Sequence, residues 1–202
     1  MNALILKKGR EKSVKRRHPW IFSGAVERVT GKPKSGDTVE VRAADGTPLA
    51  VAAWSPDSQI RARVWSFDPK TTANAEFFKA RVRRAIALRA ALPAAKHSNA
   101  LRLVHGESDG LPGVVVDRYA DVLVAQFLSA GAERWREAIL DALVEATGCE
   151  AVFERSDAEV RKLEGLELRV GWARTAGDKS PAGRGDRDAG RCPIREYGID
   201  FR

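Results

Sequence analysis

The chain has 202 residues and a formal net charge of +8, and 44% of its residues are hydrophobic. This composition supports a packed core in one large or two small domains and excludes disorder of the chain as a whole. No apolar run reaches roughly 18 residues, so no transmembrane helix is predicted, while the positive balance favours an anionic partner such as nucleic acid or a membrane surface.

Cysteine usage indicates a reducing compartment. Cys149 and Cys192 lie far apart and outside any C-x-x-C spacing, which argues against a disulfide framework and a zinc site. The apolar residues at the N-terminus are few and precede the first basic residues, which is the reverse of the order in a secretory signal. We therefore expect a cytoplasmic protein.

A dense basic segment near the start is the most distinctive feature of the chain. Residues 7–17 hold seven basic residues and one acidic residue, and Pro19-Trp20-Ile21-Phe22 follows. Concentrated positive charge beside aromatic rings suits a phosphate backbone with unstacked bases. A solvated helix face that only keeps the protein soluble is the alternative, and the residues alone leave the two interpretations about even.

The first third of the chain has the pattern of a small β-barrel. Short strands are expected at the ranges 3–6, 21–29, 38–43, 49–54 and 60–67, separated by turn signals such as Asp45-Gly46. One or two helical turns are expected within 10–17, ending before Pro19. In the alternating strand 60–67, one face carries Arg61, Arg63 and Trp65; this face either binds RNA or packs Trp65 on a neighbouring helix, with packing slightly favoured.

The middle of the chain alternates helices and strands. Helices are expected over 75–92, with Asn74 as N-cap, and over 132–147, with Gly148 as C-cap. Strands are expected at 101–104, 114–117, 122–128, 150–154 and 166–170. The first helix has a basic face with Lys79, Arg81, Arg83, Arg84 and Arg89, which favours amphipathic packing over a dedicated RNA-reading role, although this face could add to a shared positive surface.

Residues 175–191 change character, because they contain no large aliphatic or aromatic side chain. A flexible linker is expected there, and a reading-frame slip is the other interpretation. The glycines between Gly183 and Gly190 do not match a dinucleotide-binding loop, which needs a strand before it and a helix after it. Residues 193–202 look like a strand pair.

The chain offers few candidates for catalysis. Glu107 and Asp109, in a glycine-rich loop, suit either an ordinary turn or an acid–base or metal pair, and the turn is favoured. The three histidines have no metal-ligand spacing, and no nucleophile stands beside a base. We therefore predict no catalytic, cofactor-binding or metal-binding residues in this chain.

Several ordered blocks resemble one family. They are Lys8 to Ser13 with Arg16 to Ala25, Ser58 to Trp65, Gly106 to Gly113 with Val116 to Tyr119, and Glu154 to Gly165. Together they look like the N-terminal half of the S-adenosylmethionine-dependent 23S ribosomal RNA methyltransferases that modify cytosine at carbon 5. The resemblance runs from about residue 4 to 168. The family's cysteine nucleophile and cofactor loop match no position here.

The resemblance implies an α+β chain, in which a PUA-like β-barrel is followed by a small α/β linker domain of hairpins and two helices. A Rossmann-like catalytic domain is expected to be absent, with domains at 1–70, 71–172 and 173–202. We expect no cofactor in this chain, although S-adenosylmethionine is implied for the full-length family. The implied partner is ribosomal RNA, with no membrane, and a homodimer stays open.

The leading interpretation is the RNA-binding and linker portion of such a methyltransferase, inactive alone and truncated. The residues predicted to contact RNA are Lys8, Arg10, Lys12, Arg16, Arg17, His18, Trp20, Arg61, Arg63 and Trp65. There are two alternatives. The chain could be a basic interaction module without catalysis, or it could be a methyltransferase subunit that a partner completes.

Overall fold

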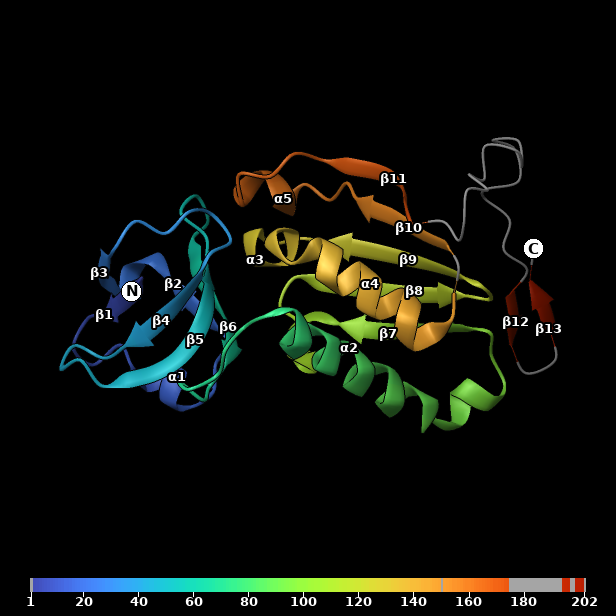
Figure 1. Cartoon of the computed structure of the whole chain (residues 1–202), viewed down its shortest axis with the longest axis horizontal. Coiled ribbons are helices and arrows are strands. Elements are labelled where there is room, and N and C mark those ends of the chain that lie inside the picture. Colours follow the sequence, from blue (N-terminus) through green and yellow to red (C-terminus); the bar gives the residue numbers. More distant parts are fainter. Residues whose placement is uncertain (1, 150, 175–193, 197–198, 202) are drawn as a thin grey trace.

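A computed structural model describes residues 2–149, 151–174, 194–196 and 199–201, and it shows two β-sheets side by side (Figure 1). The first sheet has six strands in the order β2-β6-β5-β4-β1-β3. Their bounds are β1 Ala3–Leu6, β2 Trp20–Phe22, β3 Val26–Thr30, β4 Thr38–Arg42, β5 Pro48–Trp54 and β6 Ile60–Ser66. The short helix α1, Lys12–Lys15, connects β1 to β2.

This sheet is open, with β2 and β3 as its edges, whereas the strand spacing predicts a small barrel. The strand expected over 21–29 is interrupted by a 3₁₀ turn, η1, at Ser23–Ala25. The chain therefore leaves β2 at one edge and returns as β3 at the other. The core of the sheet is formed by buried aliphatic residues, among them Leu4, Leu6, Val14, Ile21, Val39, Val41, Ala62 and Val64.

The second sheet has five strands in the order β11-β10-β9-β8-β7. Their bounds are β7 Ala100–His105, β8 Val114–Tyr119, β9 Val122–Phe127, β10 Ala151–Ser156 and β11 Arg169–Arg174. Helices cover one face of this sheet (Figure 1): α2 Ala75–Ala90, α3 Ala130–Arg134 and α4 Arg136–Thr147, while the short α5 Val160–Leu163 lies between β10 and β11. The 3₁₀ turns η2, Pro93–Lys96, and η3, Gly106–Asp109, flank β7.

The helices form where the sequence indicates, with one exception. The side chain of Asn74 accepts a hydrogen bond from the Phe77 amide, and Gly148 ends α4 with φ 66°. The single helix expected over 132–147 is two helices, because Trp135 leaves helical geometry with φ −103° and ψ 11°. Ser129 caps the first of them, so helical structure begins two residues earlier than expected.

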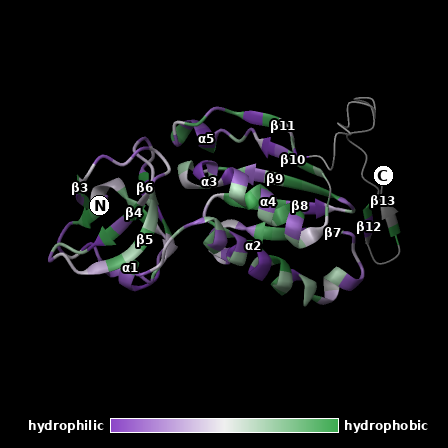
Figure 2. Cartoon of the chain, viewed as in Figure 1, coloured by the Kyte–Doolittle hydropathy of each residue, from purple (hydrophilic) through white to green (hydrophobic). Residues whose placement is uncertain are grey.

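Strand β9, helices α3 and α4, and strand β10 form a parallel βαβ unit. This unit is the elementary repeat of Rossmann-like folds. It departs from the expected fold class, in which a Rossmann-like part is absent. Figure 2 shows hydrophobic and hydrophilic residues interspersed along both the strands and the helices of the second half.

Strand β6 is buried on both faces because it lies between the two halves of the structure. Val64 belongs to the core of the first sheet, whereas Trp65 joins the core beneath α2 and α4. The Trp65 and Phe78 rings pack edge to face, with centroids 4.9 Å apart. The two sheets therefore share packed apolar surface, which fixes the position of one relative to the other.

The closing strands β12, Ile194–Glu196, and β13, Ile199–Phe201, pair antiparallel, as expected for the end of the chain. The expected linker at 175–191 and the Gly183–Gly190 loop lie outside the described residues. No helix in the described part of the chain is long and apolar enough to cross a membrane. The division at residues 70 and 172 stays a prediction.

Candidate functional site

The basic segment, residues 7–17, lies on the surface of the first sheet. Val14 is only 3% exposed and packs into the core of that sheet, which turns the rest of α1 outward. The five basic residues of this segment that the sequence predicts to contact RNA are all exposed: Lys8, Arg10, Lys12, Arg16 and Arg17. The sequence pattern thus places these cations where a large partner can reach them.

The charge of this segment is not neutralised internally. Among the described residues, no carboxylate forms an ion pair with any Lys or Arg of residues 7–17. Glu11, the one acidic residue in the segment, is half-buried and has a buried carboxylate oxygen. Clustered unpaired cations raise the local positive potential, which attracts polyanions.

Three aromatic rings adjoin the basic segment. His18, Trp20 and Phe22 are exposed, and Trp20 contacts both neighbours, with centroids 6.0 Å from His18 and 6.3 Å from Phe22. The indole Nε1 of Trp20 donates a hydrogen bond to Glu107 Oε1 at 2.6 Å, which ties β2 to η3. Exposed rings held in place in this way can stack on nucleic acid bases.

The three residues of β6 that were predicted to contact RNA are buried or half-buried, unlike those of the basic segment. Trp65 is 2% exposed and Arg63 is 7% exposed, and Arg63 donates to Glu164 at 2.8 Å. Arg61 is half-buried over the Trp54 ring. Because β6 is sandwiched between the two halves, its second face is interior, so we remove Arg63 and Trp65 from the proposed RNA surface.

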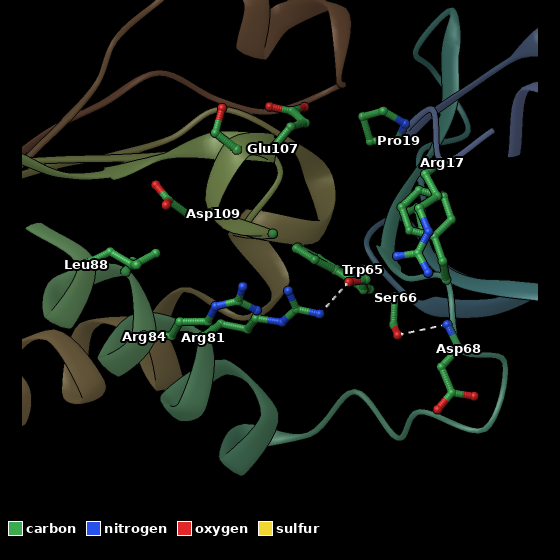
Figure 3. A pocket seen from close by; sticks show the side chains of 15 residues that line it. Arg17, Pro19, Trp65, Ser66, Asp68, Arg81, Arg84, Leu88, Glu107 and Asp109 are labelled. Atoms are coloured by element: carbon green, nitrogen blue, oxygen red, sulfur yellow. Dashed lines mark hydrogen bonds between the residues drawn. The ribbon is translucent and has the colours of Figure 1, made fainter.

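A cleft of about 440 Å³ lies between β6 and α2 (Figure 3). Its lining includes Arg17 and Phe67 from the first half and Arg81, Arg84 and Leu88 from α2. Arg81 and Arg84 belong to the basic face expected for this helix, which could add to a shared positive surface, but they were not among the predicted RNA contacts. Only the fold turns part of that face toward Arg17.

Glu107 and Asp109 line the same cleft from η3, yet both are engaged by protein donors. Asp109 forms two hydrogen bonds with Arg89, at 2.5 and 2.7 Å, and accepts another from the His105 amide. These bonds fix the turn against α2, in agreement with the structural interpretation of this loop. The described residues contain no group of three or more His, Cys, Asp or Glu side chains arranged to hold a metal ion.

Strand β9, which pairs parallel with β10, leads into the N-terminus of α3, and Rossmann-like folds bind nucleotide cofactors at such strand-to-helix junctions. Two backbone donors are already used here: Ser129 Oγ accepts from the Ala132 amide at 3.3 Å, and Glu164 Oε2 accepts from the Ala130 amide at 3.1 Å. A buried carboxylate would also repel a phosphate or carboxylate ligand. These residues therefore do not fit S-adenosylmethionine at this position.

Glu164 connects the two halves of the structure. Its carboxylate accepts hydrogen bonds from Ser55 and Arg63 of the first half and from Ala130 of the second. Burial alone would raise the pKa of Glu164, but the Arg63 charge and the surrounding hydrogen-bond donors outweigh it, and the pKa is lowered. Glu164 therefore remains ionised at the junction.

Comparison with known proteins shows which family model and which proteins this chain resembles. Residues 4–67 match the family model described as a PUA-like domain. The chain is 53% identical over 167 residues to the ribosomal RNA large subunit methyltransferase I of Shewanella frigidimarina, covering 82% of this chain and 42% of that protein. It is 48% identical over 196 residues to the protein of the same name from Erwinia tasmaniensis, covering 97% and 47%. The chain thus spans about half the length of the curated relatives it matches.

Two solved structures, both described as putative methyltransferases, match the whole chain. One is a SAM-dependent protein from Streptococcus mutans, with TM-score 0.74, 19% identity and 48% of its own chain covered. The other is complexed with SAH, with TM-score 0.74, 19% identity and 47% of its chain covered. At this identity the match concerns the fold alone.

These structures correct the expected fold class. All of the chain aligns with methyltransferase structures, and β9, α4 and β10 form a parallel unit of Rossmann type. The expectation that a Rossmann-like methyltransferase fold is absent is therefore wrong. The expectation arose because no position matches the family's cofactor loop, a feature that marks cofactor binding rather than the βαβ topology itself.

Proposed function

Since the chain carries a PUA-like domain and is a close homologue of the ribosomal RNA large subunit methyltransferase I proteins, we propose that it supplies the RNA-binding part of a methyltransferase acting on ribosomal RNA. The observation that carries the proposal is the basic segment at residues 7–17, whose cations are exposed and form no ion pair among the described residues. In the whole protein, S-adenosylmethionine would supply the methyl group, and cytosine carbon 5 would receive it.

RNA is bound by two kinds of contact, which are ionic contacts with phosphates and stacking on bases. Lys8, Arg10, Lys12 and Arg16 contact phosphates of the RNA backbone, which position the strand without reading its sequence. Trp20 and Phe22, which are 36% and 48% exposed, stack on unpaired bases. Each base stacked on an aromatic ring contributes about 1–3 kcal/mol. The ring of His18 supports Trp20 by edge contact.

In this proposal the described residues hold the RNA, with the first sheet providing the surface and Glu164 fixing it to the second sheet. A reducing cytoplasm, where ribosomal RNA is found, fits this role, and Cys149 is a free, buried thiol.

The proposal is tested by reversing two cations of the basic segment. We expect the double variant Lys12→Glu/Arg16→Glu to bind a single-stranded ribosomal RNA fragment at least tenfold more weakly and with a shallower salt dependence. The slope of log K against log salt should fall by about 1.4 for two lost phosphate contacts. Filter binding at several salt concentrations measures both quantities.

The matched control is Arg155→Glu/Lys162→Glu, which changes the net charge equally. Both control side chains are 58% exposed and lie near α5, away from the basic segment. If the control weakens binding as much as the test variant, the effect comes from net charge alone and the proposed surface is wrong. An acidic protein competing equally with RNA would favour the interaction module instead.

A further inference from the structure

We propose that the cleft between β6 and α2 binds a phosphate group of the RNA strand, held by Arg81 and Arg84 of α2 and by Arg17 on the opposite wall. We call it the arginine cleft, defined by these three residues (Figure 3). This inference rests on the proposed function and extends it to a site outside the PUA-like domain, because Arg81 and Arg84 lie beyond residue 67.

Contacts with neighbouring residues hold the guanidinium of Arg81 in place. Its guanidinium lies 5.0 Å from the centroid of the Phe77 ring, and its Nη2 donates to the Trp65 carbonyl oxygen at 3.4 Å. It also lies against Gly110, where a Cβ atom would stand only 2.3 Å from Nη1. The absence of a side chain at Gly110 leaves room for this guanidinium. A preordered arginine loses less conformational entropy when it binds an anion.

The positive charge of the cleft is uncompensated. Among the described residues, none forms an ion pair with Arg17, Arg81 or Arg84. Burial and the neighbouring Arg84 charge lower the pKa of Arg81. An anion placed between the two guanidinium groups would relieve their repulsion.

The acidic residues of the cleft lining do not fill this role. Asp109 is paired with Arg89, and Glu107 accepts from Trp20 and lies 3.8 Å from Arg63. Asp68 is exposed, and its carboxylate accepts the Lys70 amide at 3.0 Å. With these carboxylates occupied elsewhere, a phosphate, which accepts several hydrogen bonds from arginine, suits the vacant donors.

The cleft continues the basic segment rather than standing apart from it. Arg17 ends that segment and lines the cleft, and its backbone has φ 62°, a left-handed conformation that is uncommon for residues other than glycine. Its guanidinium lies 5.7 Å from the centroid of the Phe67 ring. A strand that follows the cations of α1 therefore meets the cleft next. The volume of about 440 Å³ is within the range of small-molecule sites, enough for a phosphate with its nucleoside.

The test compares neutral variants on one helix. We expect Arg84→Gln to lower the salt slope of ribosomal RNA binding by about 0.7, and Arg81→Gln/Arg84→Gln to lower it by about 1.4, with affinity falling roughly tenfold in the double variant. The control is Arg83→Gln, because Arg83 lies on the same helix but pairs with Glu145. Its slope should equal that of the wild type.

The outcomes separate this inference from the proposed function. If Arg81→Gln/Arg84→Gln leaves slope and affinity unchanged while Lys12→Glu/Arg16→Glu weakens binding, the cleft inference is wrong and the proposed function stands. If the wild type shows no salt-dependent RNA binding, both are wrong. Because Arg84 is exposed, Arg84→Gln should fold normally, and a melting curve equal to that of the wild type would verify this. The slope measured for this single variant then tests the inference even if the double variant is destabilised.

Separate titrations distinguish an RNA strand from a free phosphate compound as the source of the phosphate. An RNA oligonucleotide, cytidine monophosphate and inorganic phosphate are each titrated into the protein, and the amide signal of Gly110 is followed by NMR. We expect only the RNA oligonucleotide to saturate the site at micromolar concentration. Saturation by the mononucleotide in the same range, lost in Arg81→Gln/Arg84→Gln, would assign the cleft to a free nucleotide and contradict the assignment to an RNA strand.

Discussion

Glu164→Ala should destabilise the protein more than any change at its surface. The side chain of Glu164 is 1% exposed and lies 2.8 Å from the guanidinium of Arg63, which is itself 8% exposed. Removing one partner of a buried ion pair leaves the other charge desolvated and unpaired, which costs about 3–5 kcal/mol. Hydrogen bonds from Ser55 and the Ala130 amide are lost as well.

The lower end of this range applies, because Arg63 retains a second carboxylate. Glu107 Oε1 lies 3.8 Å from Arg63, and the guanidinium also lies 5.8 Å from the centroid of the Trp20 ring. We therefore expect a loss of about 3 kcal/mol in the free energy of unfolding. For a protein of this size that corresponds to a fall in Tm of about 6–12 °C.

Urea unfolding followed by circular dichroism measures this loss, and Glu159→Ala is the matched control. Glu159 stands at the N-cap position of the short helix α5, which Glu164 follows, and it forms an exposed pair with Lys162, with side chains 76% and 58% exposed. Exposed pairs of this kind contribute at most about 1 kcal/mol. A loss at Glu164 no greater than the loss at Glu159 would refute the assignment of Glu164 as the residue that joins the two halves.

Three further expectations concern stability. Because the pKa of Glu164 is lowered in the folded state, its ionised form stabilises the protein above the ordinary glutamate pKa of about 4.3. In acid titrations, the difference in unfolding free energy between the wild type and Glu164→Gln should be full at neutral pH and shrink below about pH 4. A difference that does not depend on pH would contradict this. Gly131→Ala should cost about 1–3 kcal/mol in urea unfolding, since its Cβ would stand 2.7 Å from Cζ2 of Trp65; unchanged stability would mean that α3 does not pack as closely as described. Asn74→Ala should lower stability by about 1 kcal/mol through loss of the hydrogen bond from the Phe77 amide, and Asn74→Asp should retain most of it if the cap is responsible.

The sequence predicted most local elements because local signals decide them. The Asn74 cap and the Gly148 C-cap are properties of a few neighbouring residues, and both are confirmed. The exposure of the basic segment followed from its charge density. In each case no contact distant in the chain was needed to make the prediction.

The sequence showed only in part which faces meet. The pattern of strand β6 favoured packing of Trp65 on a neighbouring helix, and Trp65 packs on Phe78 of α2. It did not show that Arg63 is buried against Glu164. Glu164 lies 101 residues from Arg63, so no local pattern reports their pairing. The arginine cleft escaped prediction for the same reason.

The split of the expected helix 132–147 also has a tertiary cause. Gly131 packs where only a residue without a side chain fits, against Ala53 and Trp65. This close approach sets α3 against the first sheet, and α4 then follows the second sheet after the break at Trp135. Helix periodicity alone favours one continuous helix across this position.

The central claim is that this chain holds RNA through phosphate contacts of its basic segment. It is tested most directly by measuring the dissociation constant of the wild-type protein for a single-stranded ribosomal RNA fragment as the potassium chloride concentration is raised. About five phosphate contacts from the basic segment should give a slope of log K against log salt of about −3.5, and the two arginines of α2 in the arginine cleft should bring it to about −5. A slope near zero, or binding too weak to measure at low salt, would contradict the account.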